Sequence, residues 1–156
     1  MGTAWPWVST AARLGLAAVW IIAGGLKVTD PAASGRAVNA YQLMPWPAAQ
    51  VVGAVQPFLE IALGLLLLIG LAVRLSAAIS AVLLVIFMAG IVSAWSRGLA
   101  IDCGCFSKGG ALGAGQTPEY AWELARDAAF LLLAGVLLWR PRTRVSMDGL
   151  LMGVAR

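Results

Sequence analysis

The two cysteines are the residues of this chain best suited to covalent chemistry. Cys103 and Cys105 are separated only by Gly104, and they are the only thiols among the 156 residues. Thiols exchange with disulfides through a thiolate, and a strained disulfide is opened more easily than a structural one. A bond that closes so short a loop also adds little stability through chain entropy. The spacing therefore favours a redox-active pair over a structural crosslink.

Two other interpretations of the cysteine pair stay open at this point. Two small residues in a polar loop also fit unpaired thiols or an inert bond. Two thiolates together with Met44 or Met88 would suit copper(I), a soft ion that prefers sulfur ligands. The chain has no histidine, which excludes Ser–His and Cys–His catalytic pairs and histidine-ligated haem or zinc. We predict no metal site.

A second set of residues consists of charged side chains inside apolar segments. Such side chains are costly in a bilayer and normally face the interior of a helix bundle, where they are paired. The set comprises Lys27, Glu60, Glu123, Arg126 and Asp127.

Depth along the helices predicts how this polar set is paired. At about 1.5 Å per residue, Glu60 and Arg126 lie at similar depths below the outer ends of their helices, so we expect them to meet. Glu123, three residues before Arg126, is its alternative partner. Lys27 is the expected partner of Asp127 or Glu123. The set is interpreted as a structural clamp, as a polar pocket under the cysteines that accepts a quinone head group or a proton, or as both.

The composition indicates a membrane protein. The chain is 61% hydrophobic and 12% charged, which leaves too little charge for the surface of a soluble domain. The apolar residues fall in blocks of about 18 or more, the length that crosses a bilayer. The basic residues cluster at the ends of these blocks, as in membrane orientation signals. The expected partner is therefore a lipid bilayer and not a nucleic acid.

The predicted fold is all-α and integral to the membrane, a four-transmembrane-helix bundle in one domain, residues 1–156. Arg13 and Lys27 lie near the ends of the first span, where long basic side chains reach the headgroups. Asp30 and Pro31 form a helix-start signal, followed by a segment too short and polar to span. The predicted elements are spans at about 10–28, 48–73, 75–95 and 118–139, an outer interfacial helix at about 31–46, and an outer Cys-Gly-Cys loop at 96–117.

The distribution of basic residues predicts the orientation. Four spans place both termini on one side, together with Arg74 and the basic tail at 140–144. The side richer in Lys and Arg is normally cytoplasmic. We expect a multi-pass protein of the plasma membrane with both termini in the cytoplasm. The cysteine loop is then extracytoplasmic, in a compartment that permits disulfides.

Several motifs resemble those of the methylamine-utilisation MauE family, within the DoxX-like membrane proteins. Cys-Gly-Cys-Phe at 103–106 precedes a last span that carries Arg126-Asp127. The first span runs from Arg13-Leu-Gly-Leu to Asp30-Pro31, and Glu60 is followed by Gly64. The resemblance covers nearly the whole chain. Ser107 stands where the usual motif has glycine.

The resemblance implies a fold and a function. Members of the family are four-span membrane proteins, and MauE is implicated, with a thioredoxin-like partner, in disulfide formation in an exported methylamine dehydrogenase subunit. By position, Cys103 and Cys105 would be the redox pair. Glu60, Arg126 and Asp127 would be the buried polar set.

We therefore expect a membrane-anchored thiol–disulfide oxidoreductase. Its Cys103–Cys105 disulfide, present in the resting protein, would exchange with an extracytoplasmic thioredoxin-like protein or another disulfide client. Because the chain has only one cysteine pair, the electrons would go directly to a quinone, to a partner's cysteines, or no further than the single bond. The alternative is a non-catalytic membrane anchor subunit of a quinone-linked, DoxX-like oxidoreductase complex.

Overall fold

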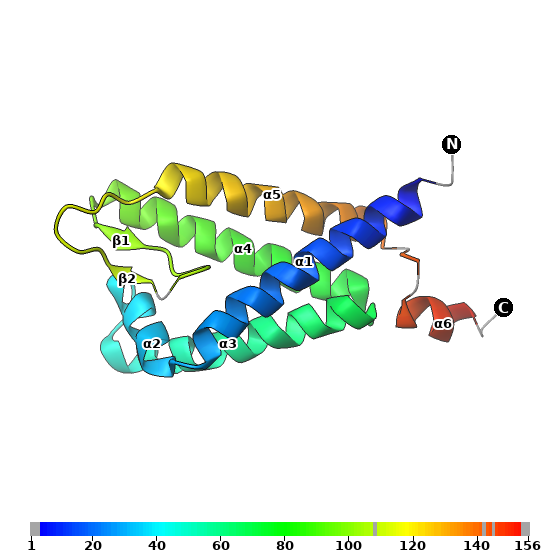
Figure 1. Ribbon diagram of the computed structural model, residues 1–156, viewed down its shortest axis with the longest axis horizontal. Helices are drawn as coiled ribbons and strands as arrows, with labels where there is room; N and C mark the ends of the chain where they lie inside the picture. Colours follow the sequence, from blue (N-terminus) through cyan, green and yellow to red (C-terminus); the bar gives the residue numbers. More distant parts are fainter. Residues whose placement is uncertain (1–3, 108, 142, 145, 154–156) are drawn as a thin grey trace.

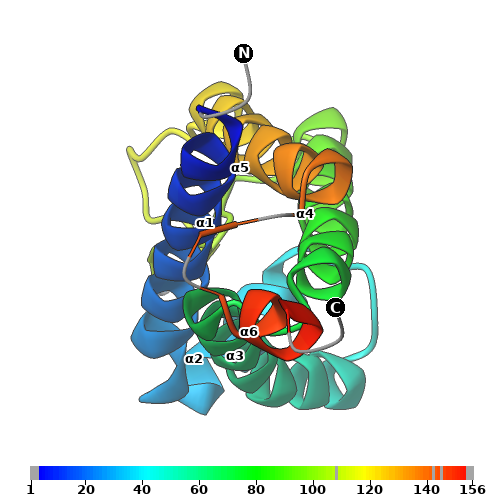
Figure 2. The same cartoon turned by 90° about the vertical axis from the view of Figure 1, so that its right-hand side faces the viewer.

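The computed structural model describes residues 4–107, 109–141, 143–144 and 146–153. Arg142 of the basic tail lies outside this part. Within it, four long helices lie side by side, in the order α1, α3, α4, α5 around the bundle (Figures 1 and 2). They are α1 (Trp5–Val28), α3 (Trp46–Ile69), α4 (Val73–Ser96) and α5 (Tyr120–Trp139). The helix α2 (Pro31–Ala40) and the strands β1 (Ile101–Asp102) and β2 (Gly110–Ala111) lie at one end, and α6 (Met147–Gly153) lies at the other.

The helices α1, α3 and α4 are long and apolar enough to cross a membrane. Each has 24 residues, which at about 1.5 Å per residue exceeds the roughly 30 Å of a bilayer core. The three corresponding predicted spans are thus confirmed as helices of membrane-spanning length, although α1 begins at Trp5 rather than near residue 10. The helix α5 has 20 residues and carries three charged side chains in its first half.

Local signals set the boundaries of α2. The Asp30 carboxylate accepts the Ala33 N–H at 2.9 Å, and Pro31 occupies the first helical position, as the sequence predicts. The helix ends at Ala40 rather than near residue 46. Pro45 keeps Met44 out of the helical region, so a new helix has to begin after it.

Small residues allow α1 and α3 to pack closely. A Cβ atom on Gly24 would lie 2.7 Å from the Pro57 carbonyl oxygen, and one on Gly64 would lie 3.0 Å from the Ala17 carbonyl oxygen. Helices in membranes commonly associate through such positions. In the core, Trp20 Nε1 donates to Ser80 Oγ at 2.9 Å, which connects α1 to α4.

The cysteine segment is folded against α2 rather than extended as a free loop. The strands β1 and β2 form an antiparallel ladder that pairs Ile101 with Ala111 and Asp102 with Gly110, which the sequence does not predict. Because Gly109 has no Cβ, its backbone packs against Ala37 of α2. The helix α2 itself rests on α3 through Gly35 and Gly53, where a Cβ on Gly53 would lie 2.4 Å from the Gly35 nitrogen. These contacts hold the cysteines over the end of the bundle.

The opposite end of the bundle is also held by polar contacts that the sequence does not predict. Arg13 does not reach the membrane surface: its side chain is only 2% exposed, and Nη1 donates to the carbonyls of Leu67 and Leu68, both at 3.0 Å. A cation at the carbonyl end of α3 complements the helix dipole. In α6, the Asp148 carboxylate accepts the N–H groups of Ala72 and Val73, at 2.8 and 2.9 Å, and so caps α4.

Candidate functional site

The cysteine pair lies in a tight turn that directly follows β1. Gly104, between the two cysteines, has φ = +72°, a left-handed conformation that favours glycine. Its N–H donates to Asp102 Oδ1 at 2.8 Å, and Ser107 Oγ donates to the same oxygen at 2.5 Å. Asp102, the first residue of the turn, therefore holds its conformation by accepting both hydrogen bonds.

The sulfur of Cys103 receives two N–H donors. The backbone N–H of Cys105 points to it at 3.4 Å, and Arg126 Nη2 of α5 lies 3.5 Å away. The Cys103 backbone is fixed as well, because its N–H donates to Glu123 Oε1 at 3.3 Å and its carbonyl accepts the Tyr41 hydroxyl at 3.0 Å. Donors around a sulfur stabilise a thiolate. Cys103 is thus held by Tyr41, the C-cap residue of α2, and by two side chains of α5.

The two thiols have different acidities. A hydrogen bond from the Cys105 thiol lowers the pKa of Cys103 despite partial burial, and the Cys105 N–H and Arg126 act in the same direction. That hydrogen bond and burial raise the pKa of Cys105 well above its usual value. Burial also raises the pKa of Tyr41, so its hydroxyl remains a donor. Cys103 is therefore the more acidic thiol of the pair.

Both cysteines are free thiols in the structure, which differs from the disulfide expected of the resting protein. The turn directs the Cys105 N–H and the Arg126 guanidinium at the Cys103 sulfur, and such donors favour a thiolate there.

The structure pairs the charged residues differently from the pairing that their depth along the helices predicts. Lys27 does not bind Asp127 or Glu123: its Nζ lies 2.8 Å from Glu60 Oε1 and 3.1 Å from Oε2. Both side chains are buried, at 9% and 0% exposure. Gln56 Nε2, one helical turn before Glu60, donates to the same Oε1 at 2.8 Å.

Arg126 pairs with neither Glu60 nor Glu123. Its Nη2 and Nε both lie 3.1 Å from Oδ1 of the adjacent Asp127. The guanidinium also stacks on the Phe106 ring, with 4.9 Å from Cζ to the ring centroid. This side chain bends toward its sequence neighbour because the Cys103 sulfur and the aromatic ring fix its other contacts. Arg126 thus links the polar set to the thiols.

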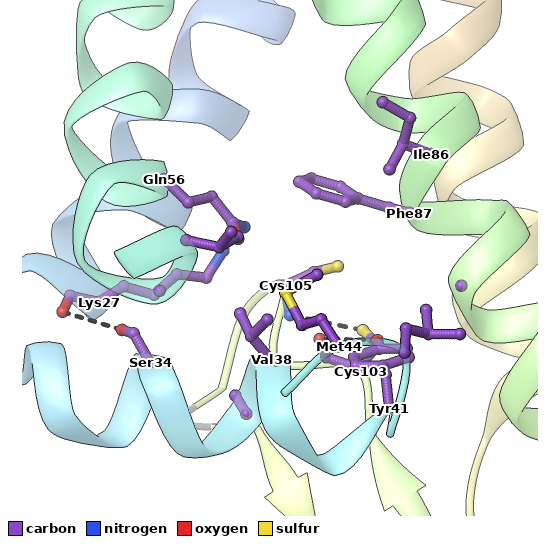
Figure 3. Close-up of a pocket in the computed structure, with 16 residues that line it drawn as sticks. Lys27, Ser34, Val38, Tyr41, Met44, Gln56, Ile86, Phe87, Cys103 and Cys105 are labelled. Carbon is purple, nitrogen blue, oxygen red and sulfur yellow. Dashed lines mark hydrogen bonds between the residues drawn. The ribbon is translucent and has the colours of Figure 1, made fainter. Parts of the chain in front are cut away.

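A cavity of about 150 Å³ adjoins the cysteines. Cys103 and Cys105 line it together with Lys27 and Gln56 on one side and Phe87 of α4 on the other, as Figure 3 shows. A smaller cavity, about 20 Å³, lies among Cys105, Lys27, Glu60 and Asp127. Cys105 lines both cavities and is the deeper thiol.

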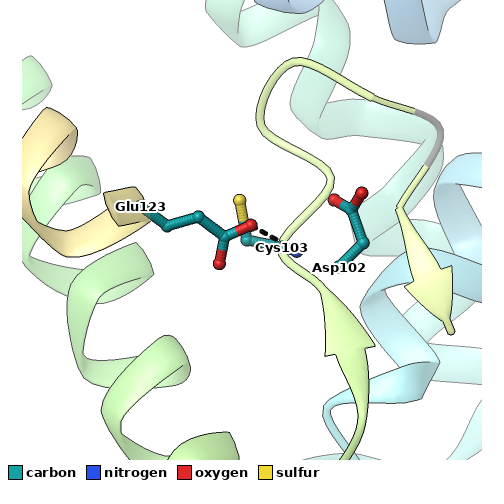
Figure 4. Close-up of side chains that lie close together, drawn as sticks. All are labelled: Asp102, Cys103 and Glu123. Carbon is teal, nitrogen blue, oxygen red and sulfur yellow. Dashed lines mark hydrogen bonds between the residues drawn. The ribbon is translucent and has the colours of Figure 1, made fainter. Parts of the chain in front are cut away.

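Three potential metal ligands lie close together at the turn. The ligand atoms of Asp102, Cys103 and Glu123 are all within 4.8 Å of one another, and Figure 4 shows the two carboxylates on either side of Cys103. One carboxylate oxygen of each acidic residue already accepts backbone N–H groups of the turn, and the Arg126 guanidinium lies against the sulfur. This cationic neighbour suits a thiolate better than a metal ion. Of the two methionines considered for copper(I), Met44 lines the 150 Å³ cavity, and Met88 is not part of its wall.

Three functional residues were not predicted from sequence. The Tyr41 hydroxyl donates to the Cys103 carbonyl, and Asp102 organises the turn. Gln56 supports Glu60 from within α3. The spacing of Gln56 and Glu60, four residues apart, was the available signal for the last contact.

The fold and the site together define a helical membrane protein with a thiol pair at one end of its bundle. Residues 5–140 match the family model described as methylamine utilisation protein MauE. The chain therefore belongs to the MauE family, whose description connects it with methylamine utilisation. No curated protein and no solved structure shows significant similarity to it.

Proposed function

We propose that this protein is a membrane-embedded thiol–disulfide oxidoreductase, in which Cys103 and Cys105 exchange a disulfide with an extracytoplasmic thioredoxin-like protein or another disulfide client. The observation that carries the proposal is the contact of Arg126 Nη2 with the Cys103 sulfur at 3.5 Å, joined by the Cys105 N–H at 3.4 Å. An inert thiol pair has no need of a partly buried cation directed at one sulfur.

In this mechanism the two cysteines have separate tasks. Cys103 carries the thiolate and forms the mixed disulfide with the partner, because it has the donors and is the shallower thiol. The sulfur of Cys105 then attacks the Cys103 sulfur, which releases the partner's thiolate and leaves the Cys103–Cys105 disulfide. In the reverse direction, a partner thiolate attacks the Cys103 sulfur and Cys105 leaves. Two electrons pass in either case.

The proposal includes α5 as the fourth span of a plasma-membrane protein, with the cysteine turn outside and both termini in the cytoplasm. At about 1.5 Å per residue, its 20 residues reach about 30 Å, the thickness of a bilayer core. Its acidic side chains Glu123 and Asp127 are buried in the bundle, whereas Leu132 is exposed on its outer face. This distribution is the one expected of a polar helix in a membrane bundle.

Adduct formation with glutathione disulfide tests the division of tasks. Purified Cys105→Ser protein should form a glutathione adduct at Cys103 at neutral pH, detected by intact-protein mass spectrometry. Cys103→Ser should form its adduct at Cys105 more slowly, since that thiol is deeper and its pKa is raised. If the two variants form adducts at equal rates, the assignment of Cys103 as the thiol that forms the mixed disulfide is refuted. Absence of adducts in both variants would favour the non-catalytic anchor subunit.

A further inference from the structure

Part of the wall of the cavity beside the thiols consists of apolar residues that also lie on the outer surface of the bundle. The helices α3 and α4 meet at their tight connection and diverge toward the end that holds α2 and the cysteine turn (Figure 1). Val52 of α3 and Ile86 of α4 line the cavity and are 40% and 57% exposed on the outer surface of the bundle. A molecule that enters between α3 and α4 must therefore be soluble in the bilayer.

The cavity has room for a ring and has polar groups at one wall. A cavity of this volume, about 150 Å³, holds a benzene ring in a well-studied engineered protein. Lys27 has three N–H donors and Gln56 has two; Glu60 accepts two of the first and one of the second. Figure 3 shows the polar ends of Lys27 and Gln56 on the side of the cavity opposite Phe87. A flat ring with an oxygen acceptor at its edge fits this arrangement.

The chemistry of the thiol pair further restricts the class of ligand that the cavity would bind. Oxidation of two thiols to a disulfide releases two electrons and two protons, and the chain has no second cysteine pair whose disulfide could take the electrons. An acceptor within reach of Cys105 must therefore take both electrons and both protons, be apolar enough to enter from the bilayer, and carry a hydrogen-bond acceptor.

From these observations we infer that the cleft between α3 and α4 binds a membrane quinone that reoxidises Cys103 and Cys105. This inference rests on the proposed exchange function and names its electron acceptor. The Cys105 S–H bond breaks and one S–S bond forms. The quinone takes the two electrons, the Cys105 proton and one proton from solvent, which replaces the proton that the Cys103 thiolate has already lost, so its two ring carbonyls become hydroxyls and it leaves as quinol. Lys27 and Gln56 are positioning residues that orient one carbonyl, and Phe87 forms the opposite wall.

Gly90 of α4 offers a way to fill the cleft without touching the thiols. It lines the cavity, and a Cβ there would meet only the Tyr41 ring, at 3.4 Å. Gly90→Leu should therefore occupy the space of the ring. Gly135→Leu is the matched control, because Gly135 is exposed near the C-terminal end of α5 with no atom within 4 Å of an added Cβ.

The test uses reduced, purified full-length protein in phosphatidylcholine vesicles without oxygen, with decylubiquinone as the probe. Its ring is fully substituted, so thiols do not add to it. Wild-type protein and Gly135→Leu should each lose two thiols per quinol formed, and Gly90→Leu should react at least about tenfold more slowly. Equal rates for wild type and Gly90→Leu, or no quinol from wild type, would overturn the inference.

Two further measurements separate this inference from the proposed function. Glutathione exchange should be unchanged in Gly90→Leu. If the wild-type protein exchanges disulfides with glutathione but does not reduce decylubiquinone, the quinone inference is refuted while the proposed exchange function stands. In Cys103→Ser, decylubiquinone should shield Cys105 from a membrane-permeant maleimide, a readout that needs no electron transfer. If Cys105 is shielded to the same extent in phosphatidylcholine vesicles that contain no decylubiquinone, the occupant of the cleft is a lipid chain, and the quinone is refuted.

Discussion

The ammonium nitrogen of Lys27 lies 2.8 Å from Oε1 of Glu60, in the contact between α1 and α3, and both side chains are buried. A buried charge that loses its partner is strongly destabilising. We expect Lys27→Met to lower the free energy of unfolding by about 3–5 kcal/mol. The measurement is thermal or denaturant unfolding in detergent micelles, followed by circular dichroism.

Two variants control this prediction. Arg36→Met makes a comparable change at an exposed position of α2 and should cost no more than about 0.5 kcal/mol. The double variant Lys27→Met with Glu60→Gln removes both charges and should recover most of the stability, because an uncharged replacement of a buried ion pair is often neutral. If Lys27→Met and Arg36→Met melt alike, the ion pair does not hold the bundle together.

The Lys27–Glu60 pair also marks how far sequence reasoning reaches. Hydropathy predicts the helices, and Asp30-Pro31 predicts the start of α2, because both signals are local. Which charged side chains pair depends on how each helix is rotated about its axis. The depth of a residue along the axis gives no information about this rotation. The close approach at Gly24 turns the face of α1 that carries Lys27 toward α3 and Glu60.

The structure of the cysteine turn was also only partly predictable from the sequence. Its glycines predict an irregular loop, whereas the structure has a two-residue ladder at 101–102 and 110–111 packed on α2. Strands this short leave no alternation to detect. The approach of Arg126 to Cys103 joins residues 23 positions apart and depends on the hairpin's fold. The sequence therefore singles out the thiols and the charged residues that meet here, but not their partners, and not the contacts of Tyr41, Asp102 and Gln56.

Arg126 is expected to set the reactivity of Cys103. It contributes to the lowered pKa of that thiol, so Arg126→Gln should raise the pKa. Less thiolate is then present at neutral pH, and the pH profile of alkylation moves to higher pH. Iodoacetamide alkylation of the Cys105→Ser variant, with and without Arg126→Gln, measures the shift. Arg74→Gln, at the opposite end of the bundle, should leave the profile unchanged; a profile that is the same in Arg126→Gln would show that the 3.5 Å contact has no effect on the thiol.

The proposed topology predicts which side of the membrane the thiols face. A membrane-impermeant maleimide, applied after mild reduction, should label Cys103 and Cys105 in intact cells. The control places a cysteine at the opposite end of the bundle, Arg74→Cys in a Cys103→Ser, Cys105→Ser background, and this thiol should be labelled only after lysis. The reverse pattern would invert the orientation inferred from the basic residues at 140–144.

The last prediction concerns the reduction potential of the pair. We expect Cys103 and Cys105 to form a disulfide under oxidising conditions and to be reduced more easily than a structural disulfide, at a midpoint above about −300 mV. Donors that stabilise the thiolate of the reduced form raise the potential, as in strongly oxidising thiol proteins. Here those donors are the Cys105 N–H and the Arg126 guanidinium on the Cys103 sulfur.

A dithiothreitol redox titration of purified protein, read by thiol alkylation and mass spectrometry, gives this midpoint. Arg126→Gln should move it to a more negative value, because the reduced form loses a charged donor while the disulfide has no thiolate to stabilise. Arg74→Gln should leave it in place, since that side chain lies at the other end of the bundle. A wild-type midpoint below about −300 mV would identify an inert crosslink. Two free thiols under oxidising conditions would instead favour copper(I) binding by Cys103, Cys105 and Met44, which line one cavity.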